Sequence, residues 1–124
     1  MKANRFNWFA LLLGLGLMAN CGRPSQGEQI YRDACNSCHM EDGNGLAQLI
    51  PPFQPTAFET DRKRLVCAVI TGINDTVQGH FMPRFKTFND ADLSNVLNYI
   101  RSIKARTSPP FIDREVAAIR NECW

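Results

Sequence analysis

The pentapeptide Cys35-Asn36-Ser37-Cys38-His39 carries the most specific chemistry in this chain of 124 residues. Two thiols about one helical turn apart can add to the two vinyl groups along one edge of a porphyrin. A histidine directly after the second thiol then lies beneath the porphyrin iron, where its imidazole can bind as an axial ligand. The motif C-x-x-C-H therefore predicts one covalently bound haem c on Cys35 and Cys38, with His39 as proximal ligand.

Other uses of these residue types are less favoured by the rest of the chain. A thioredoxin-like C-x-x-C pair needs a strand-helix-strand context, which the sequence lacks. A zinc site built on the same three residues would take its fourth ligand from Cys67 or His80. Paired, widely spaced cysteines behind an export signal argue against a zinc site, although the residue types alone leave it open.

The first 20 residues resemble a bacterial secretory signal peptide. Two basic residues precede an apolar run from Trp8 to Ala19, which at about a dozen residues is shorter than the ~20 needed to span a bilayer. Cys21 ends a segment that resembles the lipobox of bacterial lipoproteins, with Asn20 where that motif has a small residue. We therefore expect a signal peptide over 1–20, a lipid on Cys21 and a tether over 21–26.

The charge of the chain is balanced once the signal segment is removed. The full sequence has 14 Lys and Arg against 12 Asp and Glu, and Lys2 and Arg5 lie in the leader, which leaves 12 of each sign. A nucleic-acid partner is not expected, because nucleic acids are bound by basic surfaces. A chain of this length has room for one compact domain.

Helical periodicity predicts an all-α fold. Helices are expected over 26–35 and 61–73, and a third helix is expected from an Asn89 cap through Ile103, where apolar residues recur at three- and four-residue spacing. A short amphipathic helix is expected over 113–120. No alternating strand pattern was found along the chain.

Long loops are expected between these helices. The stretches 40–58 and 74–88 contain five and two glycine or proline residues, respectively, which interrupt regular structure. Loops of this length in so small a protein need a large central group to pack around. A haem would supply that group.

From Gly27 to Arg106 the chain resembles the class I cytochrome c family. That family has a glycine and, four residues later, an aromatic residue on its first helix, matched here by Gly27 and Tyr31. The aromatic residue packs against another on the last helix, matched by Tyr99. The resemblance implies a cytochrome c domain over 27–106, with three main helices and long loops around one covalently bound haem.

The resemblance also implies the remaining haem contacts. Pro51 and Phe53 match the family's proline-containing loop, so the Pro51 carbonyl is expected to accept the Nδ1–H of His39, with Phe53 packing on the ring. The Met-Pro pair at Met82 matches the distal ligand loop and makes Met82 the expected second axial ligand. Ligation by His80 and a haem with an open distal position are the alternatives.

The cysteine count predicts one disulfide. In an oxidising compartment five cysteines are all used if two hold haem, Cys21 holds lipid and two pair with each other. On its helix Cys67 lies roughly 130° from the centre of the apolar stripe, at ~100° per residue, and so points away from the haem. We expect Cys123 to pin the extension 107–124 to this outer surface, with two separate buried thiols as the alternative.

These features together predict an electron carrier and not an enzyme. The expected function is one-electron transfer in a bacterial respiratory chain, with iron ligated by His39 and Met82 cycling between Fe(II) and Fe(III). The protein is expected on the periplasmic or outer face of a membrane, tethered by lipid. Its expected partners are redox proteins, namely a quinol-oxidising complex and a terminal oxidase or reductase, and no small-molecule substrate is expected.

Two other functions are consistent with the sequence. If Met82 is displaced, the iron can bind peroxide or a small gas, as in a haem enzyme or sensor. The extension 107–124, expected to pack on the domain, hints at a dedicated subunit of a larger oxidoreductase complex. Arg84 and Lys86 lie just beyond the expected ligand and are the candidate partners of a haem propionate or an acidic protein surface.

Overall fold

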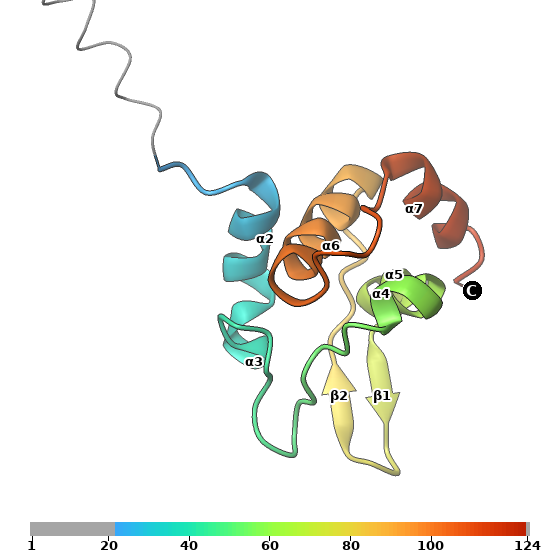
Figure 1. Ribbon diagram of the computed structural model, residues 1–124. Coiled ribbons are helices and arrows are strands. Elements are labelled where there is room, and N and C mark those ends of the chain that lie inside the picture. The colour runs from blue at the N-terminus through green and yellow to red at the C-terminus, as the bar shows by residue number, and fades with distance from the viewer. Residues whose placement is uncertain (1–21, 124) are drawn as a thin grey trace, which may run out of the picture.

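A computed structural model describes residues 22–123, so the expected signal peptide and the expected lipid site at Cys21 lie outside the described residues. Helices dominate the described chain, which confirms the predicted all-α class (Figure 1). None of the described helices is both long and apolar enough to cross a membrane. In chain order the elements are α2 (Gln26–Ala34), α3 (Asn36–His39), α4 (Ala57–Thr60), α5 (Arg62–Thr71), β1 (Ile73–Asp75), β2 (His80–Met82), α6 (Asp90–Lys104) and α7 (Asp113–Arg120).

Helices α2 and α6 pack closely against each other and form the frame of the fold. Gly27 permits the approach, because a Cβ at this position would lie 2.1 Å from the carbonyl oxygen of Asn95. Beyond the contact, the rings of Tyr31 and Tyr99 pack with their centroids 5.2 Å apart. The family resemblance implied this pair of aromatic residues, and the structure brings them together.

Side chains cap both helices of this frame. The Ser25 hydroxyl accepts a hydrogen bond from the Glu28 N–H at 3.1 Å, which fixes the start of α2. At the start of α6, Asn89 and Asp92 form a reciprocal capping box, in which each side chain accepts from the other's backbone N–H. The sequence-based starts of both helices are therefore explained by their caps.

A two-stranded hairpin follows α5, where the sequence analysis expected a longer helix and then a loop over 74–88. The helix ends at Thr71 because Gly72 adopts φ 73°, and a Cβ there would lie 2.6 Å from the Met82 carbonyl oxygen. Strand β1 then pairs antiparallel with β2, with Ile73 opposite Met82. The loop prediction is therefore wrong at both strands, which hold Met82 in a fixed register.

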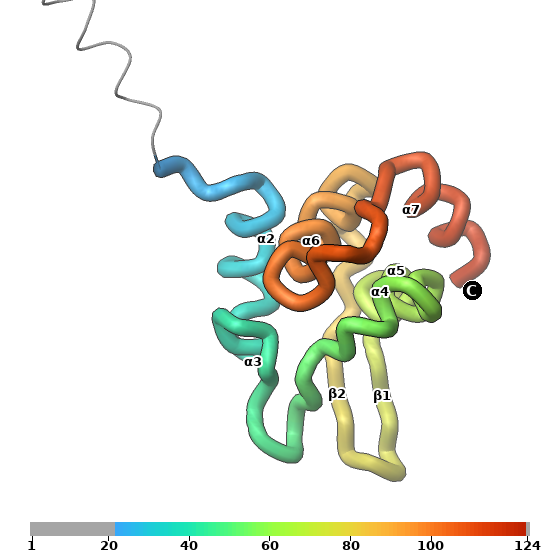
Figure 2. The backbone as a smooth tube through the Cα atoms, viewed as in Figure 1, coloured from blue at the N-terminus to red at the C-terminus, as the bar shows by residue number. Residues whose placement is uncertain are grey.

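Helix α7 packs against α5 and α6 (Figure 2). Arg62 at the start of α5 holds the tail: its Nε and one terminal nitrogen donate to the two carboxylate oxygens of Glu115 at 2.6 and 2.7 Å. The guanidinium also donates to the carbonyls of Pro109 and Pro110 and lies 3.7 Å from the centroid of the Phe111 ring. One side chain therefore contacts the tail at four positions.

Two further connections secure the same segment. The Asn98 amide exchanges hydrogen bonds with the backbone N–H and C=O of Phe111, both at 2.8 Å. A disulfide joins Cys67 to Cys123, with their Cα atoms 5.2 Å apart. Cys67 lies on the outer side of α5 and is not among the residues that line the cavities described below.

Candidate functional site

The attachment motif lies where α2 ends and α3 begins. Cys35 is the C-cap residue of α2. The His39 N–H donates to the Cys35 carbonyl at 2.9 Å, so Cys38 and His39 lie within one helical turn of Cys35. Cys35 is half-buried, Cys38 is exposed, and neither forms a disulfide. Burial, followed by the neighbouring Cys38, raises the pKa of the Cys35 thiol to about 11. The motif thus presents two free thiols on one short turn of chain.

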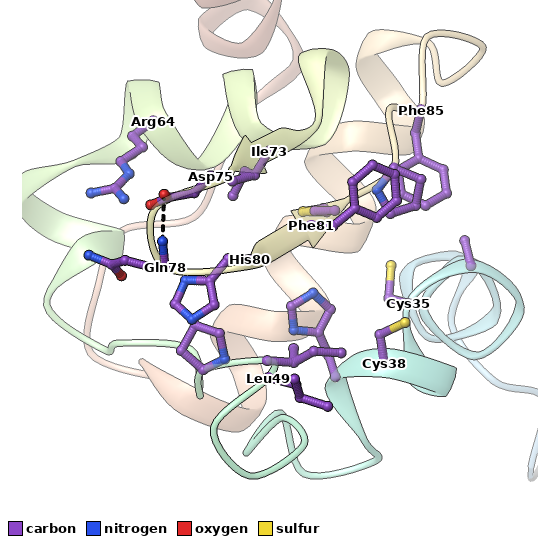
Figure 3. A pocket seen from close by; sticks show the side chains of 16 residues that line it. Cys35, Cys38, Leu49, Arg64, Ile73, Asp75, Gln78, His80, Phe81 and Phe85 are labelled. Carbon is purple, nitrogen blue, oxygen red and sulfur yellow. Dashed lines mark hydrogen bonds between the residues drawn. The ribbon is translucent and has the colours of Figure 1, made fainter.

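Both thiols face a hollow that lies between α3 and the hairpin (Figure 3). The hollow consists of two adjoining cavities of about 230 and about 260 Å³. Apolar side chains from α5 and α6 form much of the second cavity. Six residues line both cavities: Cys35, His39, Pro51, Arg64, Ile73 and Met82.

The imidazole of His39 is held by an aromatic partner. Its ring stacks on Phe53 with the centroids 4.4 Å apart and the planes 19° from parallel. Burial lowers the pKa of His39, which favours the neutral imidazole that binds metal ions. Phe53 therefore packs on the imidazole ring of His39.

The expected hydrogen bond between Pro51 and His39 is not formed in the structure. Pro51 lines both cavities, but Nδ1 of His39 is buried and has no hydrogen-bond partner within residues 22–123. The contact that the structure shows for the ring is its stacking on Phe53. The role of the Pro51 carbonyl as acceptor for His39 therefore stays a prediction.

Met82 and His80 both belong to β2. Residues two apart on a strand point to the same face, and the exposures follow this alternation, because both are half-buried while the intervening Phe81 is 71% exposed. Met82 lines both cavities, whereas His80 lines only the first and pairs across the hairpin with Asp75. Met82 and His80 therefore lie on the same strand face beside the first cavity, and Met82 also borders the second.

Arg64 was missed by the sequence analysis. It lines both cavities from α5, whereas Arg84 and Lys86 line neither of those found in the described chain. Its side chain is mostly exposed and lies 3.8 Å from the Asp61 carboxylate. Helical periodicity carried a signal, because Arg64 lies one turn before Ala68, which also lines the second cavity.

The described residues fit a covalently bound haem. Two thiols, an imidazole and a thioether lie around one mostly apolar hollow, and these are the group types that attach and ligate a haem of this kind. A zinc site is less consistent with the structure, because Cys67 is in a disulfide and the described residues contain no group of three His, Cys, Asp or Glu placed to hold a metal ion.

Comparison with known proteins finds cytochromes. A family model described as "Cytochrome C oxidase, cbb3-type, subunit III" matches residues 22–100. A gluconate 2-dehydrogenase cytochrome c subunit from Pantoea cypripedii is 31% identical over 112 residues, covering 82% of this chain and 25% of the relative. The cytochrome c subunit of a quinone alcohol dehydrogenase from Gluconobacter oxydans is 28% identical over 101 residues, covering 75% of this chain and 21% of the relative.

A shorter relative aligns along most of its length. Cytochrome c-552 from Thermus thermophilus is 27% identical over 128 residues, covering 90% of this chain and 82% of the relative. In contrast, the chain spans a quarter or less of the length of the two dehydrogenase subunits. The similarity to those two subunits therefore concerns one part of each.

Proposed function

The chain belongs to the cytochrome family described as cbb3-type cytochrome c oxidase subunit III, and on this premise we propose that it is a membrane-tethered, single-haem electron carrier of a bacterial respiratory chain. Covalent haem c is implied by the family, and a single C-x-x-C-H motif in the sequence supports one haem. The similar proteins are cytochromes or cytochrome subunits of dehydrogenases. An electron carrier with redox protein partners is therefore the function supported best.

One observation carries the proposal: His39 and Met82 come from separate elements, α3 and β2, yet line the same two cavities. Cys35 lines both cavities and Cys38 lines the first, so both thiols lie beside the two ligand candidates. We propose that the thiols hold the haem through thioether bonds and that His39 and Met82 bind its iron. When bound, the haem would supply the reversible one-electron chemistry.

The protein contributes electrostatics and exclusion of water. Apolar side chains from α5 and α6 surround the second cavity, which favours the less charged, reduced state of the cofactor. A thioether ligand acts in the same direction. Arg64 is the cation that lines both cavities, and we assign it, in place of Arg84 and Lys86, as the candidate partner of an acidic group on the porphyrin.

Electron exchange is proposed to occur at the first cavity. Of the six large apolar side chains that are exposed within residues 22–123, five lie on the turn 46–50 and the hairpin: Leu46, Leu49, Ile73, Val77 and Phe81. Leu46 and Val77 line neither cavity, so their exposure does not depend on what the cavities hold. This apolar rim supports docking of a redox protein whose own centre is bordered by apolar surface.

The tether is proposed to attach to the membrane through a lipid on Cys21. Helix α2 begins at Gln26, so only a few residues separate this thiol from the folded domain. A lipid attached this close to the fold would hold the haem site near the membrane, where quinol-oxidising complexes and terminal oxidases or reductases are found. These enzymes are the proposed partners.

The distal ligand is tested by replacing Met82 and His80 in turn with alanine. Met82→Ala should remove the charge-transfer band of methionine-ligated ferric haem and lower the reduction potential, because a strong-field thioether that favours Fe(II) is lost. His80→Ala is the matched control, since it lies on the same strand face, and should change neither property. If His80→Ala alone changes both, His80 is the ligand.

The anchor is tested by mass spectrometry of the mature N-terminus. The proposal predicts a processed protein that begins with a diacylated Cys21, and loss of membrane attachment in Cys21→Ser. An unmodified N-terminus at another residue would contradict it.

A further inference from the structure

The residue after His39 has a backbone conformation that is nearly restricted to glycine. Met40 has φ 62° and ψ 167°, a region that non-glycine residues adopt only when their surroundings hold them there. Such strain collects at functional positions. Contacts from other residues must therefore hold Met40 in this conformation.

A buried phenol makes the required contact. The hydroxyl of Tyr31, a residue that is 1% exposed, donates to the Met40 carbonyl at 2.6 Å. The same carbonyl accepts the Gly43 N–H at 3.2 Å. Burial raises the pKa of Tyr31, so the phenol remains protonated and able to donate. Two donors thus fix the carbonyl whose direction is set by the strained backbone.

This contact is connected to the imidazole by a short series of interactions. The Gly43 carbonyl accepts the Phe53 N–H at 3.0 Å, and the Phe53 ring stacks on His39. The carbonyl of His39 in turn accepts the Gly45 N–H at 3.0 Å. The turn formed by residues 40–45 therefore determines where the stacking partner of the ligand lies.

We propose that Tyr31 is a positioning residue for the axial ligand: its hydroxyl holds Met40 in a glycine-type conformation, and the resulting turn sets the orientation of the His39 imidazole through Phe53. This inference rests on the proposed role of His39 as a haem ligand. It assigns the Tyr31 hydroxyl a role distinct from ring packing against Tyr99, because removal of the hydroxyl leaves that packing intact.

The test compares Tyr31→Phe with Tyr99→Phe in the full-length, haem-loaded protein. Each change removes one phenol hydroxyl from the same ring pair, but only the first removes a donor to Met40. In Tyr31→Phe the amides of Gly43 and Phe53 should exchange hydrogen about fivefold faster, equivalent to about 1 kcal/mol for one lost hydrogen bond, while amides within α6 are unchanged. The reduction potential should rise, because a less well-oriented imidazole donates less strongly to ferric iron. Tyr99→Phe should change neither property.

A second background identifies the route of the effect. Glycine adopts the Met40 conformation without support, so in Met40→Gly the added change Tyr31→Phe should leave the potential where it is in Met40→Gly alone. If Tyr31→Phe alone does not fold, the double variant Tyr31→Phe/Met40→Gly should still fold and have the reduction potential of Met40→Gly. A double variant that does not fold, or that has a different potential, overturns the proposal.

Three further results would also overturn the inference. The first is that Tyr31→Phe changes neither the reduction potential nor the amide hydrogen exchange. The second is that Tyr31→Phe accelerates amide exchange uniformly throughout the fold. The third is that Tyr31→Phe shifts the reduction potential equally whether residue 40 is Met or Gly. A wild-type protein that carries no covalent haem would instead refute the proposed function, and the exchange rates would still report on Met40.

Discussion

Replacing Arg62 should loosen the packing of the C-terminal tail, which the disulfide still holds, and lower the stability of the domain. Arg62→Met removes two charge-assisted hydrogen bonds to Glu115, at 2.6 and 2.7 Å, and leaves a carboxylate that is only partly exposed without its partner. At roughly 1.5 kcal/mol for each such bond, the expected loss in the free energy of unfolding is about 3 kcal/mol. The carbonyls of Pro109 and Pro110 add little, because both residues are exposed and water can replace the guanidinium.

The assay is urea unfolding followed by far-ultraviolet circular dichroism, with two comparison variants. Arg62→Lys keeps the charge but not the planar fork and should lose about half as much stability. Lys63→Met is the matched control, because Lys63 also connects α5 to the tail, through Glu122 at 2.8 Å, but both of these side chains are more than half exposed. It should cost about 0.5 kcal/mol or less. An Arg62→Met variant no less stable than Lys63→Met would refute the reasoning.

Three further predictions concern the same framework. Replacing Cys67 and Cys123 together by serine should lower the free energy of unfolding by about 4 kcal/mol on the chain-entropy model, because the disulfide connects residues 56 apart. Chemical denaturation measures this loss, and a loss under about 1 kcal/mol would contradict the prediction. The hydrogen bond from Arg62 holds the pKa of Glu115 below its ordinary value of 4.5, so the carboxylate stabilises the fold fully above about pH 4.5 and loses this effect as the pH falls through the lowered pKa. The difference in unfolding free energy between wild type and Glu115→Gln should therefore become smaller on acidification. A difference that stays constant with pH would argue against the Arg62–Glu115 ion pair. Gly27→Ala should separate α2 from α6 and prevent native folding, because the added Cβ would meet the backbone of Asn95. A variant with native circular dichroism and wild-type thermal stability would contradict this close contact between α2 and α6.

The helices could be predicted because their determinants are local. The apolar spacing from Leu93 to Ile100 and the Asn89 cap define α6 without reference to the rest of the chain. The hairpin could not be found in this way, since strands of three residues are too short to show an alternating pattern. Its pairing depends instead on Gly72, whose conformation places Met82 beside the end of α5.

The site shows the same division between local pattern and spatial proximity. The attachment motif is contiguous, so sequence spacing was sufficient to propose Cys35, Cys38 and His39. Proximity in sequence to Met82 does not indicate Arg64, because Arg64 reaches the cavities from α5. The strained Met40 gives no sequence signal, because methionine, unlike glycine, does not indicate a positive φ.

A redox titration of the purified full-length protein, followed by visible absorption, tests the central claim most directly. We predict a reversible one-electron transition of a single haem that stays attached when the protein is denatured, with the methionine charge-transfer band present in the oxidised state. Absence of covalent haem, or a transition that is irreversible or involves more than one electron, would contradict the assignment of this protein as a single-haem electron carrier.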